Sequence, residues 1–205
     1  MKKEILIYLI SLLIIFTVSC KPQPPVNADL RKPAVETTII GEERESVPGA
    51  EEVSEMGMKV TSPVFENMQG IPEVYTCKGE DISPPLAWDG IPDSTTSLVL
   101  IMDDPDAPVG TWDHWIVFNL PPDLIGLEED ARSLPEGSLT GQNSWRRNDY
   151  GGPCPPGGAR HRYFFKLYAL DVLLDLPVGA KKSQIETAMQ GHILAQAELI
   201  GIYKP

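Results

Sequence analysis

The segment SLVLIMDDPDAPVGTWDHWIVF, residues 97–118, contains the two apolar runs on which the architecture depends, 97–102 and 115–118. Runs this short and continuous are typical of strands buried on both faces of a sheet. A third run, YFFKLYAL at residues 163–170, is rich in aromatic side chains and also favours a strand. The sequence therefore predicts a mostly β core in which a polar segment connects the first two strands.

One helix is expected in the last part of the chain. Ser183 and Glu186 match a capping box, the pattern with which many helices begin. Apolar residues such as Ile185 and Met189 then recur at helical spacing, and we expect this helix to continue to near Leu199. Together these patterns predict a β-sandwich-like core with a C-terminal helix.

The composition limits the classes of function. The chain has 205 residues, of which 42% are hydrophobic and 22% charged, and such a chain can bury a core. The length fits one domain with an appended segment. The formal net charge is −12 for the whole chain and −9 for residues 58–205. Because a domain this acidic repels phosphate backbones, we expect no nucleic-acid partner.

The N-terminus has the layout of a signal peptide. Two lysines precede an apolar run over residues 5–18, shorter than the roughly 20 residues that span a bilayer as a helix. Ser19 stands directly before Cys20, which resembles the lipobox of bacterial lipoproteins, where the cysteine is lipidated. We expect residues 1–19 to be a signal peptide and Cys20 to anchor the protein to a membrane outside the cytoplasm, in the periplasm or at the cell surface. The alternative is an uncleaved anchor helix.

Residues 20–57 are expected to form a stalk between the anchor and the folded domain. They are rich in proline and glutamate and have no sustained apolar period. Repulsion between the acids and the stiffness of proline should keep such a segment extended. The folded domain is therefore predicted over residues 58–205.

Polar clusters lie at the ends of the predicted strands. They are residues 103–108, His114, the Gly/Pro segment 150–158 and residues 160–163. Because side chains alternate along a strand, His161 and Tyr163 share one face, and His114 shares a face with Ile116 and Phe118. A histidine at the mouth of each of two buried strands, together with Asp104, could line one pocket.

These clusters, in this order, resemble the phosphatidylethanolamine-binding protein family, and are most similar to its bacterial and archaeal, Raf-kinase-inhibitor-like branch. The motifs are DPDAP at 104–108, HW at 114–115, GGPCPPGG at 151–158 and HRY at 161–163, and the resemblance extends over residues 58–205. It implies a β-sandwich with a C-terminal helix and short peripheral helices, and a small pocket for phosphate or phospho-headgroups. The pocket residues carried over by motif are Asp104, Asp106, His114, Gly152, Pro153, His161 and Tyr163.

The chemistry of these residues suits an anion in part. Imidazoles can donate hydrogen bonds to phosphate oxygens, and glycine lets main-chain N–H groups approach an anion closely. Carboxylates repel phosphate, so Asp104 and Asp106 need another role. One could orient a histidine and fix its tautomer, or one could face the ammonium of an ethanolamine-like head. We favour the orienting role.

Two other functions compete with a non-enzymatic binding protein. Two aspartates and two histidines could ligate a metal for phosphoester hydrolysis, but their spacing matches no short metal signature. A protein-interaction module that inhibits a protease or another envelope protein is the second alternative. We expect no enzymatic activity, no cofactor and no bound metal, and a small anionic ligand as the main partner.

The remaining cysteines, Cys77 and Cys154, form a potential pair. In an oxidising compartment they could be bridged, which would fix the Gly/Pro segment that contains Cys154. They could also persist as free thiols.

Overall fold

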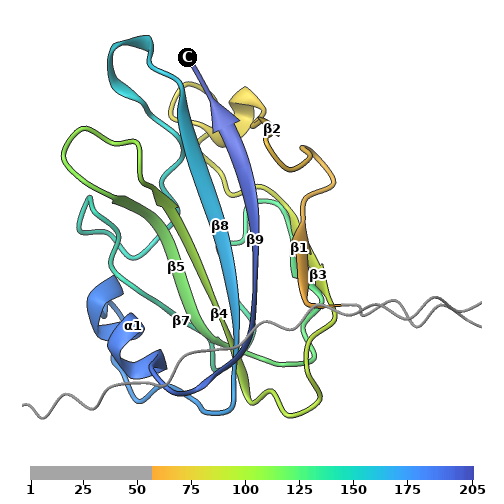
Figure 1. Cartoon of the computed structure of the whole chain (residues 1–205). Coiled ribbons are helices and arrows are strands. Elements are labelled where there is room, and N and C mark those ends of the chain that lie inside the picture. The colour runs from red at the N-terminus through yellow and green to blue at the C-terminus, as the bar shows by residue number, and fades with distance from the viewer. Residues whose placement is uncertain (1–56) are drawn as a thin grey trace, which may run out of the picture. The chain divides into compact units, whose positions relative to one another are not determined.

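The structure is a computed structural model that describes residues 57–205 and is mostly strand (Figure 1). Its strands are β1 (Lys59–Thr61), β2 (Gln69–Gly70), β3 (Leu86–Asp89), β4 (Ser97–Asp104), β5 (Trp112–Leu120), β6 (Gly126–Leu127), β7 (Leu139–Thr140), β8 (His161–Leu170) and β9 (Ile193–Tyr203). Its helical elements are α1 (Lys182–Met189) and the 3-10 turns η1 (Glu73–Tyr75) and η2 (Pro156–Gly158).

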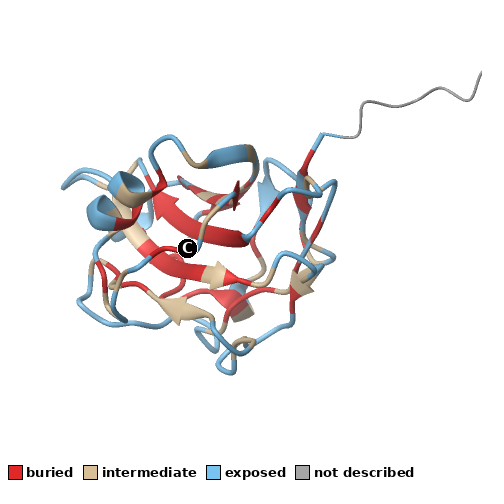
Figure 2. Ribbon diagram, turned by 90° about the horizontal axis from the view of Figure 1, so that it is seen from below, coloured by how far each residue is buried: buried red, intermediate tan, exposed pale blue. Residues whose placement is uncertain are grey.

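The strands form two sheets. The smaller has the order β1-β3-β6, and the larger has the order β2-β9-β8-β4-β5-β7. In the larger sheet β4 pairs antiparallel with β5 on one side and with β8 on the other. Every residue of β4 is buried, and Figure 2 shows the central strands as the most buried part of the domain. The three strands predicted from apolar runs are therefore confirmed.

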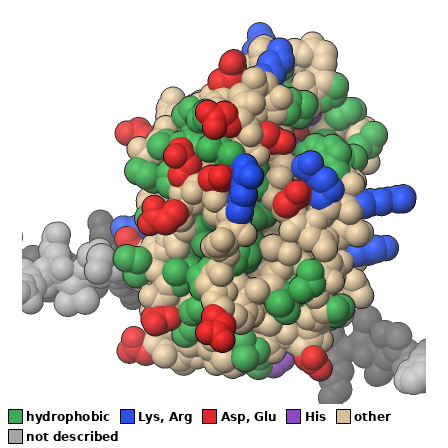
Figure 3. Space-filling view, turned by 180° about the vertical axis from the view of Figure 1, so that it is seen from behind, with side chains coloured by type: hydrophobic (Ala, Val, Ile, Leu, Met, Phe, Trp, Pro, Cys, Tyr) green, Lys and Arg blue, Asp and Glu red, His purple; other side chains and the backbone are tan. Residues whose placement is uncertain are grey.

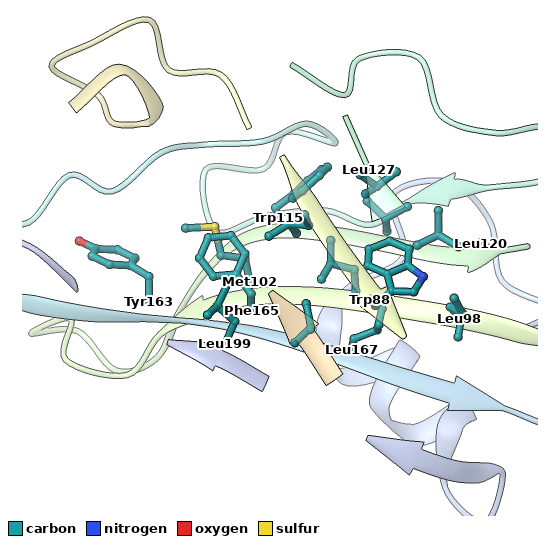
Figure 4. Packing of buried hydrophobic residues seen from close by; sticks show 14 of the residues in the cluster. Trp88, Leu98, Met102, Trp115, Leu120, Leu127, Tyr163, Phe165, Leu167 and Leu199 are labelled. Atoms are coloured by element: carbon teal, nitrogen blue, oxygen red, sulfur yellow. The ribbon is translucent and has the colours of Figure 1, made fainter. Parts of the chain in front are cut away.

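The larger sheet is covered on both faces because the side chains of its central strands alternate. Leu98, Leu100 and Met102 on β4 pack into a cluster that also contains Trp88 of the smaller sheet, as Figure 4 shows. The intervening β4 residues, Val99 and Ile101, pack into a second cluster with Ile185 and Met189 of α1. One sheet face thus meets β3 and the other meets α1, and the two faces carry different polar groups at the strand ends.

The predicted helix is too long. The helix α1 ends at Met189, and the chain from Ile193 to Tyr203 is strand β9, which pairs antiparallel with β8 along its length. Alanine, glutamine and glutamate in this segment favour helix locally, but ten paired positions with β8 override that preference. The helix also begins one residue earlier than predicted, with Lys181 as its N-cap, and Gln184 Oε1 accepts a hydrogen bond of 2.9 Å from the backbone N–H of Lys181.

The predicted signal peptide (residues 1–19), Cys20 and the stalk to residue 56 lie outside the described residues. Within residues 57–205, no helix has the length and apolar character needed to cross a membrane.

Candidate ligand-binding pocket

A pocket of about 350 Å³ opens where β4, β5 and β8 come together. Asp104 ends β4, His114 lies near the start of β5, and His161 begins β8. These three predicted residues, distant in sequence, therefore line the same pocket. The other lining residues are Ala107, Pro108, Val109, Trp112, Trp145, Cys154 and Pro156.

Asp104 holds His161 in place. Asp104 Oδ2 accepts a hydrogen bond of 2.7 Å from His161 Nδ1, and Asp104 Oδ1 accepts one of 2.8 Å from the backbone N–H of Asp106. Both side chains are buried. Because its Nδ1 is engaged with Asp104, the ring atom that His161 can present to a ligand is its second nitrogen, Nε2.

His114 is held by the backbone of the Gly/Pro segment. Its Nδ1 lies 2.6 Å from the carbonyl oxygen of Gly151, and its ring packs edge-to-face against Tyr163 and Trp145, with centroid distances of 5.2 and 5.0 Å. Burial lowers the pKa of His114 below its usual value, against the raising effect of the Gly151 hydrogen bond and of Asp104. This imidazole is therefore neutral at neutral pH.

The prediction that His114 shares a face with Ile116 and Phe118 is wrong. Those two residues belong to the cluster under α1, whereas His114 contacts Tyr163 on the opposite face of the sheet. The reason is a break in register, because Trp115 pairs with Met102 but Asp113 pairs with Asp103, which leaves His114 as an extra residue. This β-bulge reverses the alternation and turns His114 towards Asp104 and His161.

Asp106, a predicted pocket residue, faces away from the pocket. Its carboxylate accepts two hydrogen bonds from the guanidinium of Arg162, at 2.8 and 2.7 Å, and one of 3.0 Å from the Arg162 backbone N–H. The hydrogen bonds from Arg162 lower the pKa of Asp106 to about 2, although burial opposes the shift. Asp106 thus pins the loop after β4 to the start of β8.

Gly152 and Pro153, two predicted pocket residues, are not among the residues that line the pocket. The Gly152 N–H donates a hydrogen bond of 2.6 Å to Asp81 Oδ1, so this N–H is already used by the protein. A Cβ at position 152 would lie 2.5 Å from the carbonyl oxygen of Tyr75, so only glycine fits this close approach. The Pro153 carbonyl accepts a hydrogen bond of 3.1 Å from the Cys77 N–H.

A disulfide joins Cys77 to Cys154, with the two Cα atoms 5.4 Å apart. Cys154 is part of the pocket wall and is exposed, as is Cys77. The disulfide therefore links the Gly/Pro segment covalently to the second residue after the turn η1.

Tyr163 lies next to the pocket, beneath His114. Its hydroxyl is buried and lies close to the backbone of Cys154. Figure 4 shows Tyr163 at one end of the hydrophobic cluster, with the hydroxyl directed away from the other packed side chains. Burial, reinforced by the charge of Asp104, raises the pKa of Tyr163 well above its usual value, so this hydroxyl stays protonated and can only act as a neutral donor or acceptor.

The apolar part of the wall was not predicted as a site from the sequence. Trp112 and Trp145 read most simply as packing residues, and they do contact each other edge-to-face at 5.4 Å. Val109 is 76% exposed and Trp145 39% exposed at the pocket mouth. Only the positions of these apolar residues in the sequence could have indicated the wall, because each lies within a few residues of a predicted polar cluster.

The pocket therefore offers imidazole nitrogens within mostly apolar walls. Such a site can hydrogen-bond a small polar head while its walls pack against the rest of the ligand. Among residues 57–205 there is no group of three or more histidine, cysteine or acidic side chains placed to hold a metal ion.

Comparison with known proteins gives a consistent result. The model of the family described as phosphatidylethanolamine-binding protein matches residues 61–204. A UPF0098 protein of Methanothermobacter thermautotrophicus is 54% identical over 150 residues, which cover 72% of this chain and 99% of that protein. A UPF0098 protein of Pyrococcus horikoshii is 42% identical over 190 residues, covering 88% and 92% of the two chains.

Two solved structures are also similar. A homologue of phosphatidylethanolamine-binding protein from Chlamydia trachomatis superposes with a TM-score of 0.69 at 44% identity, covering 73% of this chain and 98% of that one. The E. coli protein YbcL, described as a member of the mammalian family, superposes with a TM-score of 0.66 at 30% identity, covering 72% and 98%. This chain therefore belongs to the phosphatidylethanolamine-binding protein family.

Proposed function

We propose that this protein is a non-enzymatic binding protein whose pocket holds a small anionic head, a phosphate or phospho-headgroup. The observation that carries the proposal is the convergence of His114 and His161 on one pocket, with Asp104 committed to His161. Imidazole nitrogens are suited to hydrogen bonds with phosphate oxygens, and a pocket with a few such groups in apolar walls is typical of small-ligand sites.

The carboxylate of Asp104 is compatible with an anionic ligand in the pocket. Its two oxygens accept hydrogen bonds from His161 and from the backbone of Asp106, so its charge is directed at protein donors. The arrangement supports the orienting role for Asp104, in which the carboxylate fixes the ring and tautomer of His161. Asp106, paired with Arg162, is not available to face a ligand's ammonium group.

The location of the protein is part of the proposal. A signal peptide over residues 1–19 and a lipidated Cys20 would place the domain outside the cytoplasm, tethered to a membrane by the stalk. The disulfide between Cys77 and Cys154 supports this location, because disulfides persist in oxidising compartments. On the face shown in Figure 3, basic side chains are interspersed with acidic ones.

A calorimetric titration tests the binding function. The full chain is titrated with inorganic phosphate, with phosphoethanolamine and with zinc. His161→Ala is measured beside it. His192→Ala is the control, because His192 is a half-buried histidine that pairs with Asp171 at the other end of β8. We expect saturable binding of the phospho-ligands that is lost only in His161→Ala. Binding of none of them would contradict the proposal, and tight zinc binding with phosphoester turnover would favour an enzyme instead.

A further inference from the structure

We propose that the ligand donates a hydrogen bond to His114 Nε2, so that the pocket selects anions that keep a hydrogen on their polar head and rejects fully ionised ones. This inference rests on the proposed function and specifies which anions the same pocket accepts. It follows from the tautomer that the backbone imposes on His114.

The tautomer is set at the Gly151 carbonyl. A carbonyl oxygen can only accept, so the 2.6 Å contact between it and His114 Nδ1 requires the hydrogen to be on Nδ1. In the neutral ring, Nε2 then carries a lone pair and no hydrogen. Among the described residues Nε2 has no hydrogen-bond partner, and His114 is one of the residues that line the pocket. The pocket therefore contains a hydrogen-bond acceptor at this point.

The charged groups around His114 determine whether a proton could turn this acceptor into a donor. Asp103 and Asp104 on β4 and Asp113 on its own strand favour the protonated ring. On β8 the neighbour is the neutral Tyr163, and the Gly/Pro segment presents only a backbone carbonyl. Burial outweighs the three carboxylates and lowers the pKa of His114, so the acceptor persists at neutral pH.

His161 has a different Nδ1 partner from His114. Its Nδ1 lies 2.7 Å from a carboxylate oxygen of Asp104, whereas the Nδ1 of His114 lies against a neutral carbonyl oxygen. His114 is therefore the residue that meets the ligand as an acceptor, and a head that carries a hydrogen can pair with its lone pair.

Phosphate and its monoesters have such a head, because near neutral pH they retain an O–H for part or all of the population. Sulfate has the same tetrahedral shape but no hydrogen at this pH, and it would direct a negative oxygen at the His114 lone pair. A phosphodiester lacks the P–O–H, but the ammonium of an ethanolamine head can supply an N–H instead. The shared requirement is an anion that carries its own donor, whether it is free phosphate or a lipid headgroup.

The test is a pair of titrations of the full chain with inorganic phosphate and with sulfate, at about pH 7.5 and again at about pH 5. At the higher pH we expect phosphate to bind roughly tenfold to a hundredfold more tightly than sulfate. This ratio corresponds to the usual free-energy cost of leaving a buried polar group, here His114 Nε2, without a partner. Acidification favours the protonated ring, so a smaller difference at the lower pH would mark the change of His114 from acceptor to donor. Glycerophosphoethanolamine and glycerophosphocholine distinguish the lipid source, since only the first carries an N–H.

A variant provides an independent readout. Gln in place of His114 offers both an N–H and a carbonyl, so His114→Gln should bind sulfate and phosphate with similar affinity at about pH 7.5. Equal binding of the two anions by the unmodified chain at this pH would overturn the inference and leave the proposed function intact. Binding of neither anion at either pH would overturn both.

Discussion

Lys182 on α1 donates a hydrogen bond of 3.0 Å to Asp113, the residue directly before His114. The same ammonium group lies 2.5 Å from Asp103 Oδ2, which also accepts a hydrogen bond of 2.9 Å from Lys166. Asp103 is fully buried, and Asp103 and Asp113 raise the pKa of Lys182 although burial opposes its charge. This charged cluster lies on the opposite sheet face from the pocket and joins Asp103 to Asp113, the cross-strand pair directly beside the bulge at His114.

Replacing Lys182 should therefore affect the pocket, although the lysine lies on the opposite face of the sheet. We expect Lys182→Met to lower the free energy of unfolding by about 2–3 kcal/mol, because Asp113 loses its partner and Asp103 keeps only Lys166. Phosphate affinity should fall as well, since the bulge is no longer held. Denaturant unfolding and calorimetry measure the two effects, with the exposed Lys181→Met as control. Unchanged affinity in a destabilised Lys182→Met would show that the bulge is set without α1.

The orienting role of Asp104 predicts a loss of binding with the fold retained. In Asp104→Ala the ring of His161 loses the acceptor at its Nδ1, so Nε2 is no longer directed, and phosphate binding should be abolished. Asp171→Ala is the matched control, because Asp171 also pairs with a histidine, His192, but at the other end of β8. Circular dichroism checks the fold and calorimetry the affinity. A normal affinity in Asp104→Ala would remove this assignment.

The disulfide should support both stability and binding. Reduction of Cys77–Cys154 opens a closed loop with a sequence separation of 77 residues, which on the chain-entropy model costs about 4 kcal/mol of stability. Because Cys154 is in the pocket wall, we also expect phosphate affinity to fall. Thermal unfolding and titration with and without dithiothreitol measure these effects. A Cys77→Ser/Cys154→Ser variant should resemble the reduced protein and be insensitive to dithiothreitol, and a reductant effect on that variant would point to another cause.

The Asp106–Arg162 pair predicts a stability change in acid. The folded-state pKa of Asp106, about 2, lies below its ordinary value, so the unfolded chain takes up the proton first. Its stabilising contribution is complete above the ordinary pKa and is lost as the pH falls through the folded value. We expect the difference in stability between the unmodified chain and Asp106→Asn to shrink over this range in denaturant titrations. A difference independent of pH would show that the carboxylate charge contributes nothing.

The sequence was sufficient for the elements whose pattern is local and strong. Short continuous apolar runs in the sequence suffice to predict β4, β5 and β8, and the alternation that places His161 and Tyr163 on one face is confirmed by their burial. Strand β9 was taken for helix because its pairing with β8 is a long-range property that spacing does not encode.

For the pocket, prediction from the sequence is limited in a different way. Its three central residues were predicted together, but for His114 the predicted face was wrong, and the convergence depends on a bulge that alternation cannot anticipate. The motif resemblance also included Gly152 and Asp106, whose partners turned out to be Asp81 and Arg162. Which member of a motif faces a ligand and which one braces the loop is decided by hydrogen-bond partners from distant segments.

The covalent link between Cys77 and Cys154 has a consequence for refolding. Asp104 and His114 lie inside the ring that this bond closes, and His161 follows its closing point by only a few residues. In a denatured but oxidised chain, the bond therefore shortens the contour distance between Asp104 and His161, whereas the distance between His114 and His161 hardly changes. The conformational search that brings Asp104 and His161 together is shorter than in the open chain, so the oxidised chain should regain its pocket faster than the reduced one.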